Sequence, residues 1–296
     1  MTDSDRSYVG RFAPSPSGPL HFGSLVAALG SYLDARQRNG RWLVRIEDLD
    51  PPREKPGAAD HILRTLEAFG FQWDGEVLYQ SHRVEAYREA LDSIRRQGLC
   101  YPCGCTRKEI NSAAAVGIEG PRYPGTCRGG LPAGRNARAI RMRTDNSAIC
   151  FHDRIYGRQH QRLEQESGDF IIRRADGPFA YQLAVVVDDA FQDVTQIVRG
   201  ADLLGSTPRQ LYLQHCLGYT APGYAHLPLV VDETGRKLSK QSQDLPVDGS
   251  KPIPALLEAM RFLNQPLAEA HPATPAEFWQ WSIAHWDIAR IEKRPA

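Results

Sequence analysis

The amino-acid sequence predicts an α/β protein with a parallel sheet. Short apolar segments that read as strands alternate with segments whose apolar residues recur at helical spacing. This alternation requires crossover connections, and crossovers make neighbouring strands parallel. In such sheets ligands bind beyond the carboxyl ends of the strands, so we expect the functional site at that edge.

The N-terminal part supplies the first strand–helix units. A Pro/Ser/Gly run ends the first strand, Asn39-Gly40 ends the long helix, and Pro51-Pro52 follows the second strand. The expected elements are strands at 8–12 and 42–46 and helices at about 20–38, 58–69 and 83–97.

The pattern resumes after an irregular stretch. Residues 184–187 form an uninterrupted apolar run, which predicts a buried strand, and the tail carries two amphipathic segments. The expected elements are strands at 184–187, 194–198 and 227–231 and helices at 208–217, about 253–262 and 275–284.

The irregular stretch, residues 100 to about 143, is rich in Gly, Pro, Cys and Arg and predicts an inserted module. This gives four units: 1–99, the first half of a nucleotide-binding catalytic domain; 100–180, the inserted zinc or acceptor-type module; 181–245, the second catalytic half with a lysine-rich loop; and 246–296, a helical C-terminal segment.

Bulk charge does not indicate a nucleic-acid binder, because 36 basic and 35 acidic residues leave a formal net charge of +1. Arginines nevertheless crowd one stretch, either as a patch that tracks phosphates or as a solvated surface. They are Arg122, Arg128, Arg135, Arg138, Arg141, Arg143, Arg154, Arg158 and Arg162.

The N-terminus lacks the basic and apolar regions of a signal peptide, and no apolar run is long enough to span a bilayer. We therefore expect a cytoplasmic protein without a membrane partner. In that compartment the six cysteines are expected to be thiols or metal ligands rather than disulfides.

Two distant segments suggest that the fold handles the phosphates of ATP. Residues 14–23 place a tight turn and a helix start after the first strand, where free backbone N–H groups and the positive helix end attract phosphate. His21 and Gly23 lie in this segment. Residues 235–240 form a glycine-flanked loop in which Lys237 and Lys240 can stabilise charge on a transferred phosphate. Either segment alone is also compatible with an ordinary surface loop.

A cluster of cysteines in the inserted module suggests a metal site. Cys103, Cys105 and Cys127 offer three thiolates, while tetrahedral zinc needs four donors. The candidates for the fourth donor are Cys100, Tyr123 and His152, of which ligand chemistry alone favours Cys100.

Four motifs in order resemble class I aminoacyl-tRNA synthetases of the glutamyl and glutaminyl branch, over about four fifths of the chain. Residues 14–23 are similar to the "HIGH" segment and residues 237–241, Lys-Leu-Ser-Lys-Gln, to the "KMSKS" loop. Residues 45–50, Arg-Ile-Glu-Asp-Leu-Asp, and the stretch 181–200 resemble two further motifs of the branch. The resemblance implies a Rossmann-like class I catalytic fold with a zinc-bearing insert and a short helical tail.

The resemblance also implies site residues. It assigns His21, Lys237 and Lys240 to catalysis, and His21, Gly23 and Lys240 to ATP, which is expected with Mg²⁺. It assigns structural zinc to Cys103, Cys105, Tyr123 and Cys127. For L-glutamate it points to Arg11, Phe12, Ala13, Pro14, Ser15, Glu47, Tyr181 and Arg199.

The charges of this set suit glutamate, whose two carboxylates and one ammonium need two cationic contacts and one anionic contact when they are desolvated. Arg11, Glu47 and Arg199 supply them from three predicted strand ends. As alternatives, Arg11 and Glu47 could pair with each other and Tyr181 could belong to the core. Arg199 favours glutamate over glutamine without proving it.

Two departures suggest an unusual acceptor. Only 55 residues follow Gln241, too few for the anticodon-reading domains of glutamyl-tRNA synthetases, and Ala201 and Leu203 replace a usual carboxylate and imidazole. This pattern, with residues 50–54, resembles the glutamyl-Q tRNA(Asp) synthetases. The resemblance implies tRNA-independent activation of glutamate and its transfer to queuosine at the wobble position of tRNA(Asp), with the insert gripping the anticodon stem-loop.

Three other functions stay open on the sequence: a truncated glutamyl-tRNA synthetase that charges the 3′ end, a small-molecule nucleotidyltransferase, and a non-catalytic tRNA-binding paralogue. The second shares the strand–loop–helix start, but the glutamate-type charges argue against it. We expect a monomer.

Overall fold

The computed structural model of the protein describes residues 7–113, 116–117, 120–230, 246–270 and 272–294. The strands are β1 (Val9–Phe12), β2 (Arg41–Ile46), β3 (Leu78–Tyr79), β4 (Cys100–Cys103), β5 (Val116–Gly117), β6 (Gly120–Pro121), β7 (Ala139–Met142), β8 (Ala148–Asp153), β9 (Gly157–Arg162), β10 (Ile171–Arg173), β11 (Gln196–Gly200) and β12 (Gly223–Leu227). The α-helices are α1 (Phe22–Gln37), α2 (Ala58–Ala68), α3 (Val84–Arg96), α4 (Arg107–Ala113), α5 (Leu163–Glu166), α6 (Tyr181–Phe191), α7 (Thr207–Leu217), α8 (Pro252–Phe262) and α9 (Pro275–His285).

The first half-sheet has the predicted parallel arrangement. Strand β1 pairs in parallel with β2, and β2 pairs in parallel with β3. Helix α1 makes the crossover from β1 to β2, with apolar residues such as Leu25 and Leu29 completely buried. A Cβ at Gly30 would stand 2.7 Å from a Leu227 methyl, so glycine allows the helix to lie close to β12.

The second half-sheet runs in the order β11-β12-β8-β9, with β11 parallel to β12. Thr195 joins it to the first half, because its backbone N–H donates to the Val9 carbonyl and its hydroxyl accepts from the Val9 N–H, both at 2.9 Å. The amino ends of β1 and β11 therefore meet, and their carboxyl ends open on the same side.

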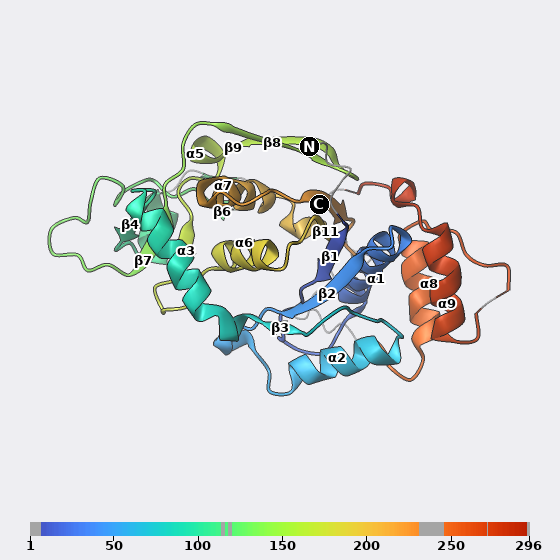
Figure 1. Ribbon diagram of the computed structural model, residues 1–296. Coiled ribbons are helices and arrows are strands. Elements are labelled where there is room, and N and C mark those ends of the chain that lie inside the picture. The colour runs from blue at the N-terminus through green and yellow to red at the C-terminus, as the bar shows by residue number, and fades with distance from the viewer. Residues whose placement is uncertain (1–6, 114–115, 118–119, 231–245, 271, 295–296) are drawn as a thin grey trace.

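The strand predicted at 184–187 is wrong. These residues lie in the middle of α6, where every residue from Leu183 to Asp189 is buried. A helix covered on all sides carries the same continuous apolar run as a buried strand, so periodicity does not distinguish the two. Figure 1 shows α6 beside α3 and α7, and the apolar side chains of these helices share a core cluster.

The strand predicted at 227–231 was placed too far along the chain, because it begins four residues later than the observed strand. Strand β12 covers Gly223–Leu227, and Pro228, which has no backbone N–H to donate, follows it directly. The strand expected at 194–198 is confirmed with a shift of two residues, as β11. The remaining expected helices and the two N-terminal strands are confirmed within about two residues.

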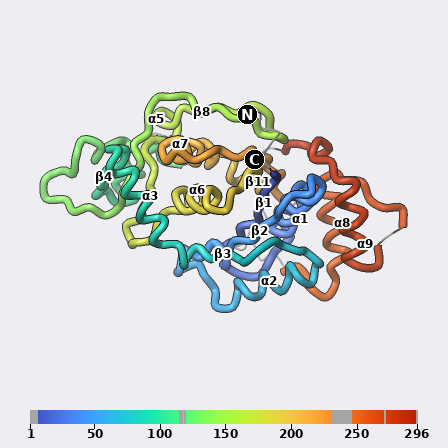
Figure 2. Tube along the Cα trace, in the orientation of Figure 1, coloured from blue at the N-terminus to red at the C-terminus, as the bar shows by residue number. Residues whose placement is uncertain are grey.

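The stretch between the two half-sheets contains a separate antiparallel sheet of order β10-β7-β4. In Figures 1 and 2, β4 and β7 lie at one end of the molecule and α8 and α9 at the other. The hairpin of β8 and β9 lies outside this small sheet, because β8 pairs in parallel with β12 through Asp153 and Tyr224. The four-unit division of the chain stays a prediction.

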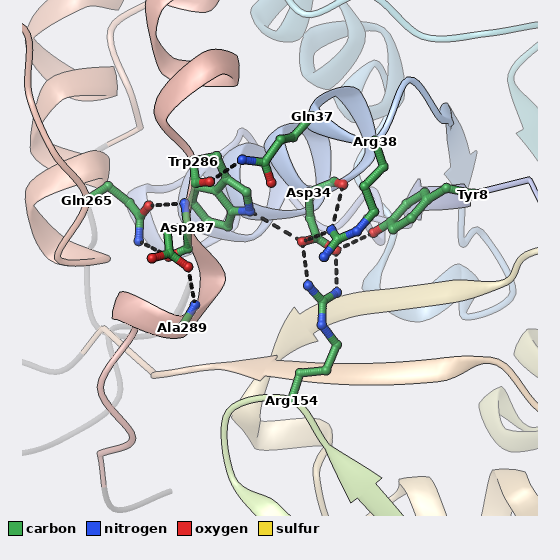
Figure 3. A network of polar contacts seen from close by, with 9 residues as sticks. All are labelled: Tyr8, Asp34, Gln37, Arg38, Arg154, Gln265, Trp286, Asp287 and Ala289. Atoms are coloured by element: carbon green, nitrogen blue, oxygen red, sulfur yellow. Dashed lines mark hydrogen bonds and ion pairs between the residues drawn. The ribbon is translucent and has the colours of Figure 1, made fainter. Parts of the chain in front are cut away.

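A polar cluster around Asp34 ties distant segments together (Figure 3). The Asp34 carboxylate, completely buried on α1, accepts from Arg154 at 2.5 and 2.8 Å and from the Tyr8 hydroxyl at 2.5 Å. Trp286 Nε1, just beyond α9, donates to it at 3.3 Å. One buried carboxylate thereby connects the β8–β9 hairpin, the first crossover helix and the C-terminal helices.

Within the described ranges, none of the helices combines the length and the apolar character that crossing a bilayer requires.

Candidate active site

A cavity of about 710 Å³ opens at the carboxyl ends of β1, β2 and β11. This volume suits a small substrate together with part of a nucleotide. Its walls contain every glutamate-site residue expected from the sequence, as well as His21 and Gly23. The members of the predicted glutamate set that line it are Arg11, Phe12, Ala13, Pro14, Ser15, Glu47, Tyr181 and Arg199.

A group of buried charges lies behind Arg11 and Glu47 in the cavity wall. Arg11 on β1 and Arg45 on β2 both contact the Asp189 carboxylate on α6, at 3.2 and 2.8 Å. Arg45 also lies 3.4 Å from Glu47 and donates to Gln192 at 2.7 Å. Arg11 and Glu47 therefore do not form the mutual ion pair that the sequence left open, because each has another partner.

The protein environment shifts the pKa values of the two carboxyl groups in this buried set, Asp189 and Glu47, in opposite directions. Burial works to raise the pKa of the Asp189 carboxyl, but Arg11 and Arg45 outweigh it and hold that pKa below its usual value. Burial raises the pKa of the Glu47 carboxyl, opposed by Arg45 and Arg11. Glu47, with a side chain 8% exposed, is thus the carboxylate of this group that most needs a further cationic partner.

Arg199, near the end of β11, also lines the cavity. Its Nε donates to His226 Nε2 at 3.1 Å and its Nη2 donates to the Thr207 hydroxyl at 2.8 Å. Its Nη1 is buried and finds no acceptor among the described residues. An unpartnered buried guanidinium nitrogen on a cavity wall is a donor suited to an anionic ligand.

Tyr181, the first residue of α6, lines the same cavity and is also partly packed against the core cluster of α3 and α7. Burial raises the pKa of its phenol, although Arg199 opposes that rise. The phenol therefore stays protonated at neutral pH, as a hydrogen-bond donor. Tyr181 therefore both lines the cavity and packs against the core, so each of the two alternatives considered from the sequence describes part of its surroundings.

The start of α1 forms another wall of the cavity. His21 is its N-cap residue, and its Nδ1 accepts from the Ser24 backbone N–H at 3.3 Å. The remaining free N–H groups and the helix dipole make this end attractive to phosphate. Gly23 in the first turn leaves room for close approach.

The predicted catalytic residues Lys237 and Lys240 lie outside the described residues, which stop at Val230 and resume at Pro246. Both of these flanking positions lie near the helix start. Val230 lines the cavity, and Pro246 forms a β-bridge with His21.

Sequence reasoning missed three residues that contact the cavity-lining side chains from behind. Asp189 and Arg45 stood within the motifs but received no role, and the contact between them joins segments 144 positions apart that no local pattern connects. His226 escaped notice because the strand that carries it was expected further along the chain. Placing β12 correctly would have put His226 near a strand's carboxyl end, where ligand-site residues gather.

The cysteine cluster of the inserted module is assembled as a ligand set. The Sγ atoms of Cys103, Cys105 and Cys127 lie within 4.8 Å of one another. The Tyr123 oxygen lies 3.3 Å from the Cys103 Sγ and 3.5 Å from the Cys105 Sγ. Cys100 is three positions from Cys103 on β4 and packs against a different core cluster, so it does not join the set.

Many of the crowded arginines are engaged within the protein. Arg128 pairs with Asp169 at 2.7 Å, Arg135 pairs with Glu109 at 2.6 Å, and Arg141 is buried against the Cys103 Sγ. Arg138, Arg158 and Arg162 are exposed. The structure thus reduces the candidate phosphate-tracking surface to a subset of the residues considered from the sequence.

Comparison with known proteins identifies the family. The family profile described as class I tRNA synthetases (E and Q), catalytic domain, matches residues 8–251. A glutamyl-Q tRNA(Asp) synthetase of Dechloromonas aromatica is 58% identical over 290 residues, 97% of this chain and 96% of the relative. One of Chromobacterium violaceum is 54% identical over 99% of this chain and 98% of its own length.

The chain belongs to the glutamyl-Q tRNA(Asp) synthetase family.

Membership of this family makes the protein a ligase of the aminoacyl-tRNA synthetase type. Solved structures agree on the fold. A glutamate tRNA ligase of Elizabethkingia meningosepticum superposes with a TM-score of 0.79 at 24% identity, over 98% of this chain and 67% of that one. A glutamate-tRNA synthetase of Elizabethkingia anophelis gives 0.80 at 24% identity, over 98% and 68% of the two chains. The class I synthetase fold predicted from the motifs is therefore confirmed.

Within that fold, a short 3₁₀-helix after β11, Ala201–Leu203, contains the two residues that depart from the usual synthetase motif, Ala201 and Leu203. Ala201 is buried, and Leu203 lines the cavity together with Asp202. The apolar replacements predicted to alter acceptor chemistry are thus located at the edge of the candidate active site, beside Arg199.

Proposed function

We propose that this protein is a cytoplasmic enzyme that activates L-glutamate with ATP in the absence of tRNA and transfers it to queuosine at the wobble position of tRNA(Asp). The observation that carries the proposal is the cavity that Arg11, Glu47 and Arg199 line together, with the Arg199 Nη1 left without an acceptor among the described residues. That charge set complements the two carboxylates and one ammonium of free glutamate.

The contacts support specific roles in glutamate binding. Arg199 Nη1 is the open donor for one carboxylate, and Glu47 is the acceptor for the ammonium, which would also satisfy its buried charge. Tyr181 adds a phenolic donor. Arg11 stays cationic beside Asp189 and serves the second carboxylate, while residues 12–15 provide the adjoining backbone wall.

The activation step needs positioning and charge stabilisation more than proton transfer. The α-carboxylate of glutamate attacks the α-phosphate of ATP in line, and pyrophosphate leaves as the mixed anhydride forms. His21, Gly23 and the start of α1 hold the nucleotide. Lys240, supported by Lys237, stabilises the developing charge, and Mg²⁺ accompanies the nucleotide. Val230 lines the cavity and Pro246 pairs with His21, and these two contacts support this role for the lysines between them.

The acceptor is proposed from the family. Relatives that are 54–58% identical to this chain over nearly their whole length bear the name glutamyl-Q tRNA(Asp) synthetase. A hydroxyl of the queuosine cyclopentene ring would attack the adenylate carbonyl and displace AMP. We propose that exposed arginines such as Arg138 grip the anticodon stem-loop and that the enzyme acts as a monomer.

A structural zinc ion fits the inserted module. Tetrahedral zinc with Zn–S bonds of about 2.3 Å separates its sulfurs by about 3.8 Å, close to the 3.6 Å between Cys105 and Cys127. Arg141 donates to the Cys103 Sγ at 3.3 Å, which stabilises a thiolate there. Cys103, Cys105, Tyr123 and Cys127 would hold the ion, which would cross-link loops that have little core of their own.

ATP–pyrophosphate exchange tests the activation step. We expect exchange with glutamate and without tRNA, and little exchange with glutamine or aspartate. Arg199→Lys should raise the KM for glutamate about 10- to 100-fold, because a charged hydrogen bond is worth about 1.5–3 kcal/mol.

Arg41→Lys is the matched control, because Arg41 is exposed at the opposite end of β2. Absence of glutamate-dependent exchange in the unmodified protein would contradict the proposal and favour a non-catalytic paralogue.

A further inference from the structure

A buried chain of polar side chains lies behind Arg199. It runs from Asp153 at the end of β8 through His226 on β12 to Arg199 on β11. Asp153 Oδ2 and His226 Nδ1 are 2.6 Å apart, and His226 Nε2 is 3.1 Å from Arg199 Nε. Asp153 and His226 are completely buried and Arg199 is 4% exposed, so the chain is shielded from solvent.

The donors and acceptors of this chain have one consistent assignment. A guanidinium only donates, so His226 Nε2 must accept from Arg199 Nε. The imidazole proton then sits on Nδ1 and is donated to Asp153. The other Asp153 oxygen accepts from the backbone N–H groups of Ile155 and Tyr156, at 2.9 and 2.8 Å. Asp153 is therefore fixed by the backbone, and it fixes the imidazole in turn.

A second contact holds the other edge of the guanidinium. Arg199 Nη2 donates to the Thr207 hydroxyl at 2.8 Å and to the Leu203 carbonyl at 3.3 Å. The Thr207 hydroxyl lies 3.2 Å from two acceptors, that carbonyl and His226 Nε2. Two of the three guanidinium nitrogens thus have fixed acceptors within the protein. The third, Nη1, is the one left buried without an acceptor in the described part of the chain.

We propose that His226, held by Asp153, is a positioning residue that orients the Arg199 guanidinium so that Nη1 is presented to a carboxylate of the substrate. This inference rests on the proposed function and extends it, because it assigns glutamate selectivity to residues that do not touch the ligand. A preoriented donor spares the substrate the loss of side-chain freedom that a mobile arginine would undergo on binding.

The protonation state of His226 agrees with this role. Burial and the neighbouring Arg199 lower the pKa of His226 to about 4, although Asp153 opposes them and Asp202 adds a weaker opposing effect. The imidazole is therefore neutral at neutral pH and has a free lone pair on Nε2. A protonated ring would direct a second N–H at the guanidinium.

Substitution of His226 tests the proposal by steady-state pyrophosphate exchange. His226→Phe removes the acceptor, so the KM for glutamate should rise about 10- to 100-fold while the KM for ATP stays within about twofold. Preference for glutamate over glutamine should fall with it. His226→Gln keeps a side-chain acceptor and should recover part of the loss. His160→Phe is the matched control, because His160 is exposed on β9.

Thermal unfolding shows whether each variant is folded. If His226→Phe does not fold, Thr207→Val, which removes the shorter of the two hydrogen bonds of Nη2 at nearly constant volume, should raise the same KM. A folded His226→Phe or Thr207→Val variant with an unchanged KM for glutamate overturns the positioning role. Unmodified protein that neither exchanges pyrophosphate with glutamate nor binds it overturns the proposed function instead.

Discussion

Single buried residues behind the cavity wall form ion pairs that the sequence alone does not reveal. Asp189 neutralises two cations, Arg11 and Arg45, that come from neighbouring strands. Without it, both guanidinium groups would face each other in a buried space, at a high electrostatic cost. Arg11, a member of the predicted glutamate set, thus depends on a carboxylate 178 positions away in the chain.

The candidate site residues could be named from the sequence because the motifs carry them and because strand ends converge at one edge. Their partners could not, since Asp189, Thr207, His226 and Asp153 contact them only through tertiary packing. The sequence thus indicated residues that line the cavity, and the structure added the buried residues that contact them.

The buried imidazole predicts a pH dependence of stability. The folded protein lowers the pKa of His226 to about 4, so its contribution is complete above the unfolded value of about 6.5. That contribution falls as the pH drops, by on the order of 3 kcal/mol at pH 4, because the unfolded chain binds the proton more readily. Urea unfolding of the protein and of His226→Gln between pH 7.5 and 4.5 measures it.

The difference in unfolding free energy between the two proteins should shrink as the pH falls, because the Gln variant lacks the titrating group. A difference that stays constant over this range would show that His226 does not titrate as its burial implies.

At the scale of elements, local pattern was informative wherever a segment had one exposed face. Helices α2 and α3 have clear apolar and polar sides, and both were predicted within about two residues. Helix α6 is enclosed along Leu183–Asp189, and its apolar run was misread as a strand. The misread helix carries two residues that matter to the candidate site. Tyr181 is its first residue, and Asp189 lies on its buried part, where it contacts Arg11.

The inserted module gives a prediction about metal. Purified protein should contain one zinc ion per chain, and Cys105→Ala should lose most of it, because the cluster leaves no other cysteine within 4.8 Å among the described residues. Elemental analysis measures the content. Cys150→Ala is the control, since Cys150 is exposed on β8. Unmodified protein free of zinc after purification without chelator would refute the metal site.

At the scale of the whole molecule, polar contacts join the two half-sheets, the hairpin and the C-terminal helices. Thr195 joins the half-sheets, and Asp34 links α1 to Arg154 and to Trp286 beyond α9 (Figure 3). The C-terminal segment therefore packs against α1, the crossover helix that has His21, a predicted ATP-binding residue, as its N-cap.

The destination of the activated glutamate is also a property of the whole molecule, because it depends on how a tRNA is held as well as on the cavity. The family and the apolar residues Ala201 and Leu203 support the queuosine base over the 3′ end. A class I fold shared with glutamate tRNA ligases is compatible with both acceptors, so the fold does not decide between them.

The most direct test is mass spectrometry of nucleosides from tRNA(Asp) incubated with the enzyme, ATP and isotopically labelled glutamate. The account predicts labelled glutamate on the wobble queuosine and none on the 3′-terminal adenosine, with no labelling of tRNA(Asp) that lacks queuosine. Label on the 3′-terminal adenosine, or efficient charging of the queuosine-free tRNA, would contradict it.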